Sequence, residues 1–203
     1  TIVGYQGCVA SNAAGTTVLN NCNLTKEYVK TSSHVFYVNH ADAKVIVNGG
    51  TYNHNGFDGS LAYVIAGEVT INGGTFNAKD GGYGFAALSA GKVTINGGNI
   101  NAGLLNWGGQ FVVNGGVFTS QPSYLAAGLK AVKKDGKYYV VAEDIDAVAT
   151  TQGDLESALN ANDDIVLTAG TYTMPAGNSF TAQTVLTCEE GVVFEGTSKL
   201  NIN

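Results

Sequence analysis

The hexapeptide VTINGG occupies residues 69–74 and returns unchanged at residues 93–98. Close variants stand on either side of this pair, with VIVNGG at 45–50 and FVVNGG at 111–116. Aligned on the Asn, these copies are 24, 24 and 18 residues apart, and TVLNNCNLT at 17–25 fits the same frame. A period of this length is typical of a solenoid, in which each repeat forms one turn of chain.

Apolar and polar residues alternate around each copy of the turn. The apolar positions form three columns, which are Val45, Val69, Val93 and Phe111, then Val47, Ile71, Ile95 and Val113, then Tyr52, Phe76, Ile100 and Phe118. Thr and Asn fill the positions between them, which is the period of a strand with one buried face. Helical repeats are excluded because the repeated unit is a β-branched run closed by Asn-Gly-Gly. The sequence therefore predicts an all-β, right-handed parallel β-helix, in which equivalent side chains of successive coils lie over one another.

The Asn of each turn is expected to join one coil to the next. Gly allows the left-handed backbone of a tight corner and Asn tolerates it, while the Asn amide can bond to the Asn of the neighbouring coil. The predicted ladder consists of Asn20, Asn48, Asn72, Asn96 and Asn114. Four residues before the Asn, the series Lys44, Glu68, Lys92 and Gln110 alternates in charge. We interpret that series either as cross-strand pairing or as an ordinary solvated surface.

The pattern also divides the chain. We expect β-helix repeats over residues 1–120, a capping hairpin and linker over 121–147, and a second β-helix-like unit over 148–203. The hairpin turns at Lys134-Asp135-Gly136 and would cover the last coil, whose parallel edge is otherwise a template for aggregation. In the second unit, Thr151 is placed to cap a short helix with Asp154 at its third position.

Both ends of the chain, TIVG and KLNIN, have the composition of strand interiors. We therefore expect a processed protein or a piece of a longer one. Its open β-helix ends are expected to stack on neighbouring copies or on further chain, so self-association is predicted.

Composition excludes several classes of partner. The formal net charge is −6, and all ten basic residues are Lys, so there is no basic stripe for nucleic acid. No run of 18 apolar residues occurs, so no membrane insertion is expected. Cys8, Cys22 and Cys188 do not form a disulfide framework or a metal motif, and we expect small buried side chains. A Cys8–Cys22 bridge is the alternative.

No catalytic, metal-binding or cofactor motif emerges from the sequence, so no catalytic residue, metal or cofactor is predicted. The three histidines are His34, His40 and His54. A metal could be shared by His40 with Asp42, or by His54 with Asp58, but the spacing favours neither. Asp58 and Asp80 could likewise flank a glycosidic bond from adjacent loops.

Four aromatic residues fall in the arcs where the coil length varies, namely Phe57, Tyr63, Tyr83 and Trp107. Variable loops on a rigid scaffold are where ligands usually bind. We predict a contact with carbohydrate or a partner through these rings, and the alternative is that they pack the arcs onto the body.

Two segments resemble known families. The stretch GGVFTSQPSYLAAGLKAVKKDGKYYVV resembles the end of β-helix repeats in gut-bacterial surface proteins and in virion proteins of their phages. That resemblance covers residues 40–142, through the GG-x-F, YLA-x-G and Y-x-V elements. Residues 148–203 resemble the N-terminal cap of pectin-lyase-like folds and phage tailspikes. Neither segment carries a catalytic motif.

The resemblance implies a non-enzymatic structural or adhesive protein, an extracellular virion component such as a fibre, spike or capsid decoration used in host attachment. Its partners would be other virion or surface proteins, further copies of itself and a cell-surface glycan. One alternative is a β-helix adhesin on the bacterial cell surface. Another is a polysaccharide lyase or glycosidase of the pectin-lyase-like fold, although such lyases use Arg or Lys beside calcium and this chain has no Arg.

Overall fold

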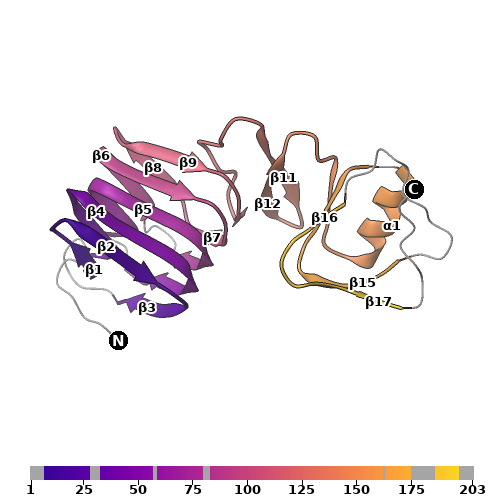
Figure 1. Ribbon diagram of the computed structural model, residues 1–203, viewed down its shortest axis with the longest axis horizontal. Coiled ribbons are helices and arrows are strands. Elements are labelled where there is room, and N and C mark those ends of the chain that lie inside the picture. Colours follow the sequence, from indigo (N-terminus) through magenta and orange to yellow (C-terminus); the bar gives the residue numbers. More distant parts are fainter. Residues whose placement is uncertain are drawn as a thin grey trace. The chain divides into compact units, whose positions relative to one another are not determined.

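Strands of successive coils lie side by side in the computed structural model, as the alternating pattern requires (Figure 1). The structure describes residues 7–27, 33–56, 59–79, 83–161, 163–174 and 186–196. These residues are mostly strand with one short helix, and they form a β-solenoid of about 7 turns. The predicted all-β solenoid class is confirmed.

The chain divides into two units, residues 1–127 with 136–140 and residues 128–135 with 141–203. The solenoid repeats of the first unit comprise β1 (Gly7–Ser11), β2 (Gly15–Leu19), β3 (Cys22–Lys26), β4 (Ser33–His54), β5 (Gly59–Ala78), β6 (Tyr83–Ile95), β7 (Asn99–Asn101), β8 (Leu104–Trp107), β9 (Gln110–Val113) and β10 (Val117–Phe118). Each of β4 and β5 runs through an Asn-Gly-Gly corner, with a shift of register next to its Asn.

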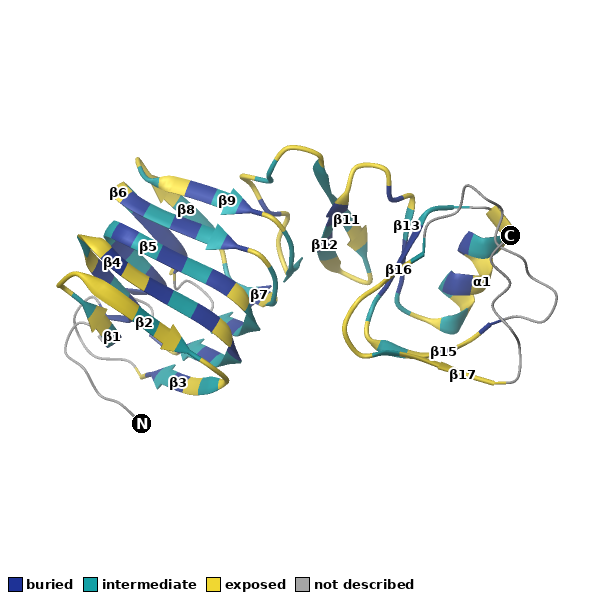
Figure 2. Ribbon diagram, viewed as in Figure 1, coloured by how far each residue is buried: buried dark blue, intermediate teal, exposed yellow. Residues whose placement is uncertain are grey.

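Parallel pairing places equivalent residues of successive coils over one another. Strand β4 pairs with β1, β2 and β3 on one side and with β5 on the other, and β6 pairs with β5, β8 and β9. The first predicted column runs Val45↔Val69↔Val93↔Phe111 in this register. Every member of the three predicted columns is at most 8% exposed. Figure 2 shows buried and less buried residues alternating along β4, β5 and β6, which is the source of this core.

An antiparallel strand covers the last coil of the first unit. Strand β12 (Lys137–Ala142) pairs antiparallel with β10, through Val117↔Tyr139 and Phe118↔Tyr138. Strand β11 (Leu129–Lys134) precedes it, and the turn between them has φ of 49° at Asp135 and 76° at Gly136. Two successive positive φ values are the mark of a type I′ hairpin turn. The antiparallel strand uses the backbone groups that a parallel edge would leave open.

The second unit is a shorter set of parallel pairs with one helix. Its elements are β13 (Ala147–Ala149), α1 (Gln152–Ala161), β14 (Ile165–Leu167), β15 (Gly170–Thr173), β16 (Leu186–Cys188) and β17 (Val192–Glu195). One sheet has the order β13-β14-β16 and another pairs β15 with β17, all parallel. Leu155 and Ala158 of α1 are buried against these strands. Parallel strands follow the helix as expected, but the unit does not begin with the helix, since β13 precedes α1 and pairs with β14.

Helix α1 begins with the predicted cap. The amide of Asp154 donates to Thr151 Oγ1 at 3.2 Å, and the amide of Thr151 donates to Asp154 Oδ2 at 3.0 Å. This reciprocal pair is a capping box with Asp in place of Glu. Burial raises the pKa of Asp154, but hydrogen bonds from Lys134, Thr151 and Thr150 outweigh that effect and hold the pKa well below its usual range. The carboxylate is therefore charged where it meets the positive end of the helix.

The three thiols are free. Cys8 is buried with Sγ 3.8 Å from the carbonyl of Thr25, whereas Cys22 is half-buried and Cys188 is exposed. The Cys8–Cys22 bridge that the sequence left open is not formed, and only Cys8 is the expected buried side chain. Within the described residues, no helix has the length and apolar character needed to cross a membrane.

Candidate functional site

Asparagines at the corners form a continuous hydrogen-bonded column. Each side-chain Nδ2 donates to Oδ1 of the preceding coil, and every one of these distances is 2.8 Å. The order is Asn114 to Asn96, Asn96 to Asn72, Asn72 to Asn48, and Asn48 to Asn20. The five residues that the sequence singled out therefore lie over one another. Amides stacked in this way hold neighbouring coils in register.

The left-handed backbone of the corner falls on the second glycine. Its φ is 99° at Gly50, 110° at Gly74, 100° at Gly98 and 108° at Gly116. None of the ladder asparagines has a positive φ, which corrects the expectation that they share this conformation. A Cβ on Gly74 would lie 2.9 Å from the carbonyl oxygen of Gly50, while one on Gly73 would lie 3.8 Å from its nearest neighbour. The second glycine is thus required by both conformation and space.

A second ladder runs parallel to the first, five residues further along each coil. Asn101 donates to Asn77 at 2.6 Å, Asn77 donates to Asn53 at 2.8 Å, and Asn53 donates to Thr25 Oγ1 at 3.2 Å. This ladder was not predicted, although the same spacing of 24 residues applies to it. Each of its asparagines directly follows a residue of the buried column of Tyr52, Phe76 and Ile100.

On another side of the coils, three of the four predicted aromatic residues come together. The rings of Tyr83 and Trp107 meet edge to face with centroids 5.6 Å apart, and those of Tyr63 and Trp107 do so at 6.3 Å. The fourth residue, Phe57, lies outside the described residues, as do Asp58 and Asp80. The rings surround a hollow of about 140 Å³, lined by His34, Gly59, Ser60, Tyr63, Tyr83, Ala86 and Trp107. We call this the aromatic hollow.

The strand register explains why the hollow exists. Tyr37, Tyr63, Ala86 and Leu105 occupy one row across β4, β5, β6 and β8. The small side chain of Ala86 leaves space beside Tyr63 in this row. Trp107 stands at the end of β8, where the amide of Gly108 donates to Asn106 Oδ1 at 3.0 Å and Gly108 has a φ of 90°. A tight turn therefore fixes the strand end that carries the indole.

His34 forms part of the wall and was not predicted as a contact residue. Its ring stacks on Tyr63 with centroids 4.5 Å apart. Its Nδ1 lies 2.9 Å from Ser60 Oγ and accepts the backbone N–H of Ser60 at 3.2 Å. Since a backbone N–H can only donate, Nδ1 is the unprotonated nitrogen and the ring proton is on Nε2. His34, Ser60 and Tyr83 share one row of the strand register, so alignment of the coils would have grouped His34 with the predicted Tyr83.

His34 and Ser60 of this wall belong to a set of buried polar side chains that also includes Lys26, Ser33 and His54. His54 Nε2 donates to the carbonyl of Ser33 at 2.8 Å. Burial, then the neighbouring His54 and Lys26, lowers the pKa of His34 to about 4. Burial is also the main cause that lowers the pKa of His54. Both rings are therefore neutral at pH 7 and accept or donate hydrogen bonds without charge.

Of the metal and acid–base candidates, only His40 with Asp42 lies wholly within the described residues, because the other two pairs include Asp58 or Asp80. The amide of Asp42 donates to His40 Nδ1 at 3.1 Å, which is a local turn contact. Within the part of the chain that the structure describes, no three His, Cys, Asp or Glu side chains lie close enough to hold a metal. In the row that alternates in charge, Lys44 Nζ lies 3.6 Å from Glu68 Oε2.

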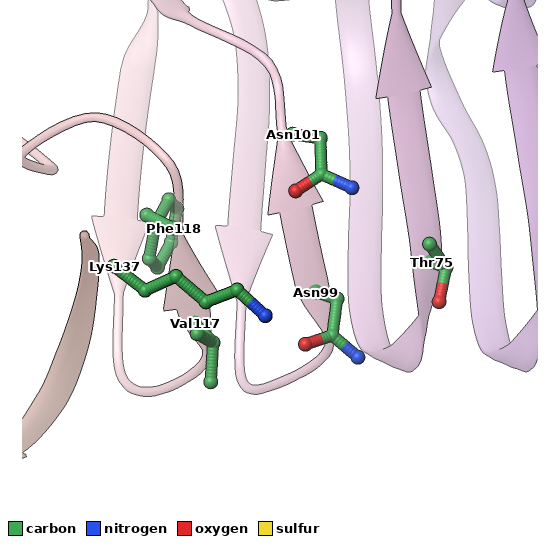
Figure 3. Close-up of a pocket in the computed structure, with 6 residues that line it drawn as sticks. All are labelled: Thr75, Asn99, Asn101, Val117, Phe118 and Lys137. Carbon is green, nitrogen blue, oxygen red and sulfur yellow. The ribbon is translucent and has the colours of Figure 1, made fainter. Parts of the chain in front are cut away.

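A second hollow, of about 260 Å³, lies on the outer face of β5, β7, β10 and β12. It is lined by Thr75, Asn99, Asn101, Val117, Phe118 and Lys137. Figure 3 shows the Lys137 side chain extended past Phe118 and Val117 with its ammonium directed toward Asn99. The amide oxygens of Asn99 and Asn101 point to the same side. This surface offers hydroxyl, amide and ammonium groups but no exposed aromatic face, so it is the weaker of the two candidates.

No protein-family model, curated protein or solved structure matches the chain.

Proposed function

We propose that the protein is a non-enzymatic, stiff module that projects or braces a surface, and that it serves as a phage virion component such as a fibre, spike or capsid decoration. The observation that carries the proposal is the unbroken amide column from Asn20 to Asn114 over a stacked core. In a solenoid each coil contacts only its neighbours, so a continuous column joins the coils from Asn20 to Asn114 into one stiff body. The resemblance of residues 40–142 to repeats in phage virion proteins supports a particle as the location, and gut-bacterial surface proteins, which share those repeats, are the basis of the adhesin alternative.

The test is copurification. Particles from a culture that produces the protein would be isolated on a density gradient, and their proteins quantified by mass spectrometry. A virion component is expected at a fixed ratio to the major capsid protein across the particle peak. Recovery with the cell envelope instead would contradict the proposal and support the adhesin alternative.

The enzyme alternative has its own readout. A lyase or glycosidase would release unsaturated or reducing ends from capsular polysaccharide or pectin. Under the proposed function, the purified chain releases neither from a glycan panel, and release of either product would contradict the non-enzymatic role.

A further inference from the structure

We propose that the aromatic hollow binds one neutral pyranose ring of a surface glycan. The inference rests on the proposed role at a surface and adds to it the chemical class of the ligand. Its basis is the joint presence of exposed aromatic rings, hydrogen-bonding groups and a small open hollow.

Size limits what the hollow can hold. Its volume of about 140 Å³ is well below the ~300 Å³ at which pockets for drug-sized ligands begin. It is a hollow at one point of the coil surface, lined by residues of the neighbouring strands β4, β5, β6 and β8. One sugar ring, at a chain end or branch, suits it better than several units of a polymer.

The lining has the two kinds of surface that a sugar presents. Tyr83 is 45% exposed and Trp107 is 46% exposed, so apolar ring area at the mouth stays in contact with water. The C–H face of a pyranose can cover that area, while its hydroxyls can reach the phenol oxygens and the indole N–H. Covering such rings releases their hydration water, and the polar tips keep hydrogen bonds.

Charge determines the kind of sugar. The described residues that line the hollow include no Lys, Asp or Glu, and His34 is neutral at pH 7 because its pKa is about 4. A uronic or sialic acid would therefore bury its carboxylate against uncharged side chains, which is costly. A quaternary ammonium prefers ring faces. Here the rings of Trp107, Tyr63 and Tyr83 meet edge to face, and no described lining residue carries a carboxylate that would pair with such a cation.

The chain supplies its own probe, because Trp107 is its only tryptophan. The full chain would be titrated with methyl β-D-glucopyranoside, methyl β-D-galactopyranoside and N-acetylglucosamine while tryptophan emission is recorded. We expect a saturable change with at least one of these neutral sugars. N-acetylneuraminic acid and choline chloride are expected to give no saturable change.

Tyr83→Ala removes one wall and is expected to weaken the binding at least tenfold. Tyr124→Ala is the matched control, since Tyr124 is 41% exposed but stacks on Phe111 rather than on the hollow. Circular dichroism would show that both variants keep their strand content. The inference is overturned by a flat titration with every neutral sugar, by equal affinity in wild type and Tyr83→Ala, or by saturation with the acidic sugar or choline alone.

The result can be separated from that of the proposed function. If the hollow binds no sugar but the protein copurifies with particles, the ligand is wrong and the structural role stands. If the sugar binds but the protein is absent from particles, the site stands and the virion role fails.

Discussion

The corner side and the arc side of the same coils differ in how strictly their side chains repeat. At the corner, each coil from Asn20 to Asn114 places an Asn that bonds directly to the Asn of the coil before it, although the spacing changes from 28 to 24 and then to 18 residues. At the arc, one row holds Tyr63, Ala86 and Leu105 in turn, and the offset between paired strands falls from 23 to 19 residues along it. The constant side aligns the coils, and the variable side opens the aromatic hollow. A solenoid can thus carry a site without interrupting its ladder.

The strongest test of the comparison is at the corner glycines. Gly74→Ala is expected to lower the free energy of unfolding by about 4 kcal/mol, combining about 1–2 kcal/mol of left-handed strain with about 1–3 kcal/mol of overpacking. Gly73→Ala, one residue earlier, meets no close atom and has no positive φ, so it is expected to cost less than about 1 kcal/mol. Chemical denaturation of both variants measures the difference, and equal losses would contradict the assigned corner geometry.

On the arc side, we expect the free energy of unfolding to depend on pH through His34. His34 takes up a proton near pH 6.5 when unfolded but only at about pH 4 when folded. Between these values the unfolded chain binds more protons, so stability falls as pH falls. The loss attributable to His34 is about 3 kcal/mol across the window, and His54 acts in the same direction.

Denaturation midpoints measured from pH 7 to pH 4 would check this. His34→Phe keeps a ring against Tyr63 but removes the titration, so the slope should flatten even if the overall stability is lower. His40→Asn is the control and should keep the slope of the wild type. An unchanged slope in His34→Phe would show that His34 is not the source of the pH dependence.

Removing one rung of the ladder should have a smaller effect. Asn72→Ala deletes the hydrogen bonds to Asn48 and from Asn96, both 2.8 Å long. At about 1 kcal/mol net for each bond, less for exposure to water, we expect a loss of about 1–2 kcal/mol. Asn39→Ala, at an exposed asparagine outside the ladder, should stay within about 0.5 kcal/mol of wild type. Equal free energies of unfolding for the two variants would mean that the ladder hydrogen bonds do not stabilise the coils.

The smallest effect is expected at the charged row. Lys44 and Glu68 lie 3.6 Å apart with side chains 54% and 40% exposed, so water and salt screen them. Glu68→Gln should change the free energy of unfolding by about 0.3 kcal/mol, and by less in 1 M salt. A loss above about 1 kcal/mol that persists in high salt would mean that this row also holds the register.

Sequence reasoning predicted the corner side in detail and the arc side only in part. The ladder asparagines and apolar columns could be read because their spacing repeats, as for Val69 and Val93. Tyr63, Tyr83 and Trp107 were singled out, but their meeting could not be derived, since it depends on register shifts such as the one between Val64 and Ala66.

The buried polar residues escaped prediction for a related reason. Lys26 and His54 are paired in register, yet the linear sequence places them 28 residues apart with no motif that joins them. Burial of Lys and His runs against their usual exposure, so composition gives no hint of it. The stacking of coils brings them into the same buried set as Ser33, His34 and Ser60, and the last two also line the aromatic hollow.

The central claim, that successive corners stack in register through their asparagines, can be measured directly by NMR. Selective ¹⁵N labelling of asparagine in the full chain would allow side-chain amide contacts to be recorded. The account predicts cross-peaks between the amides of Asn48 and Asn72, of Asn72 and Asn96, and of Asn96 and Asn114. Spectra in which these amides contact other residues, or only water, would contradict it.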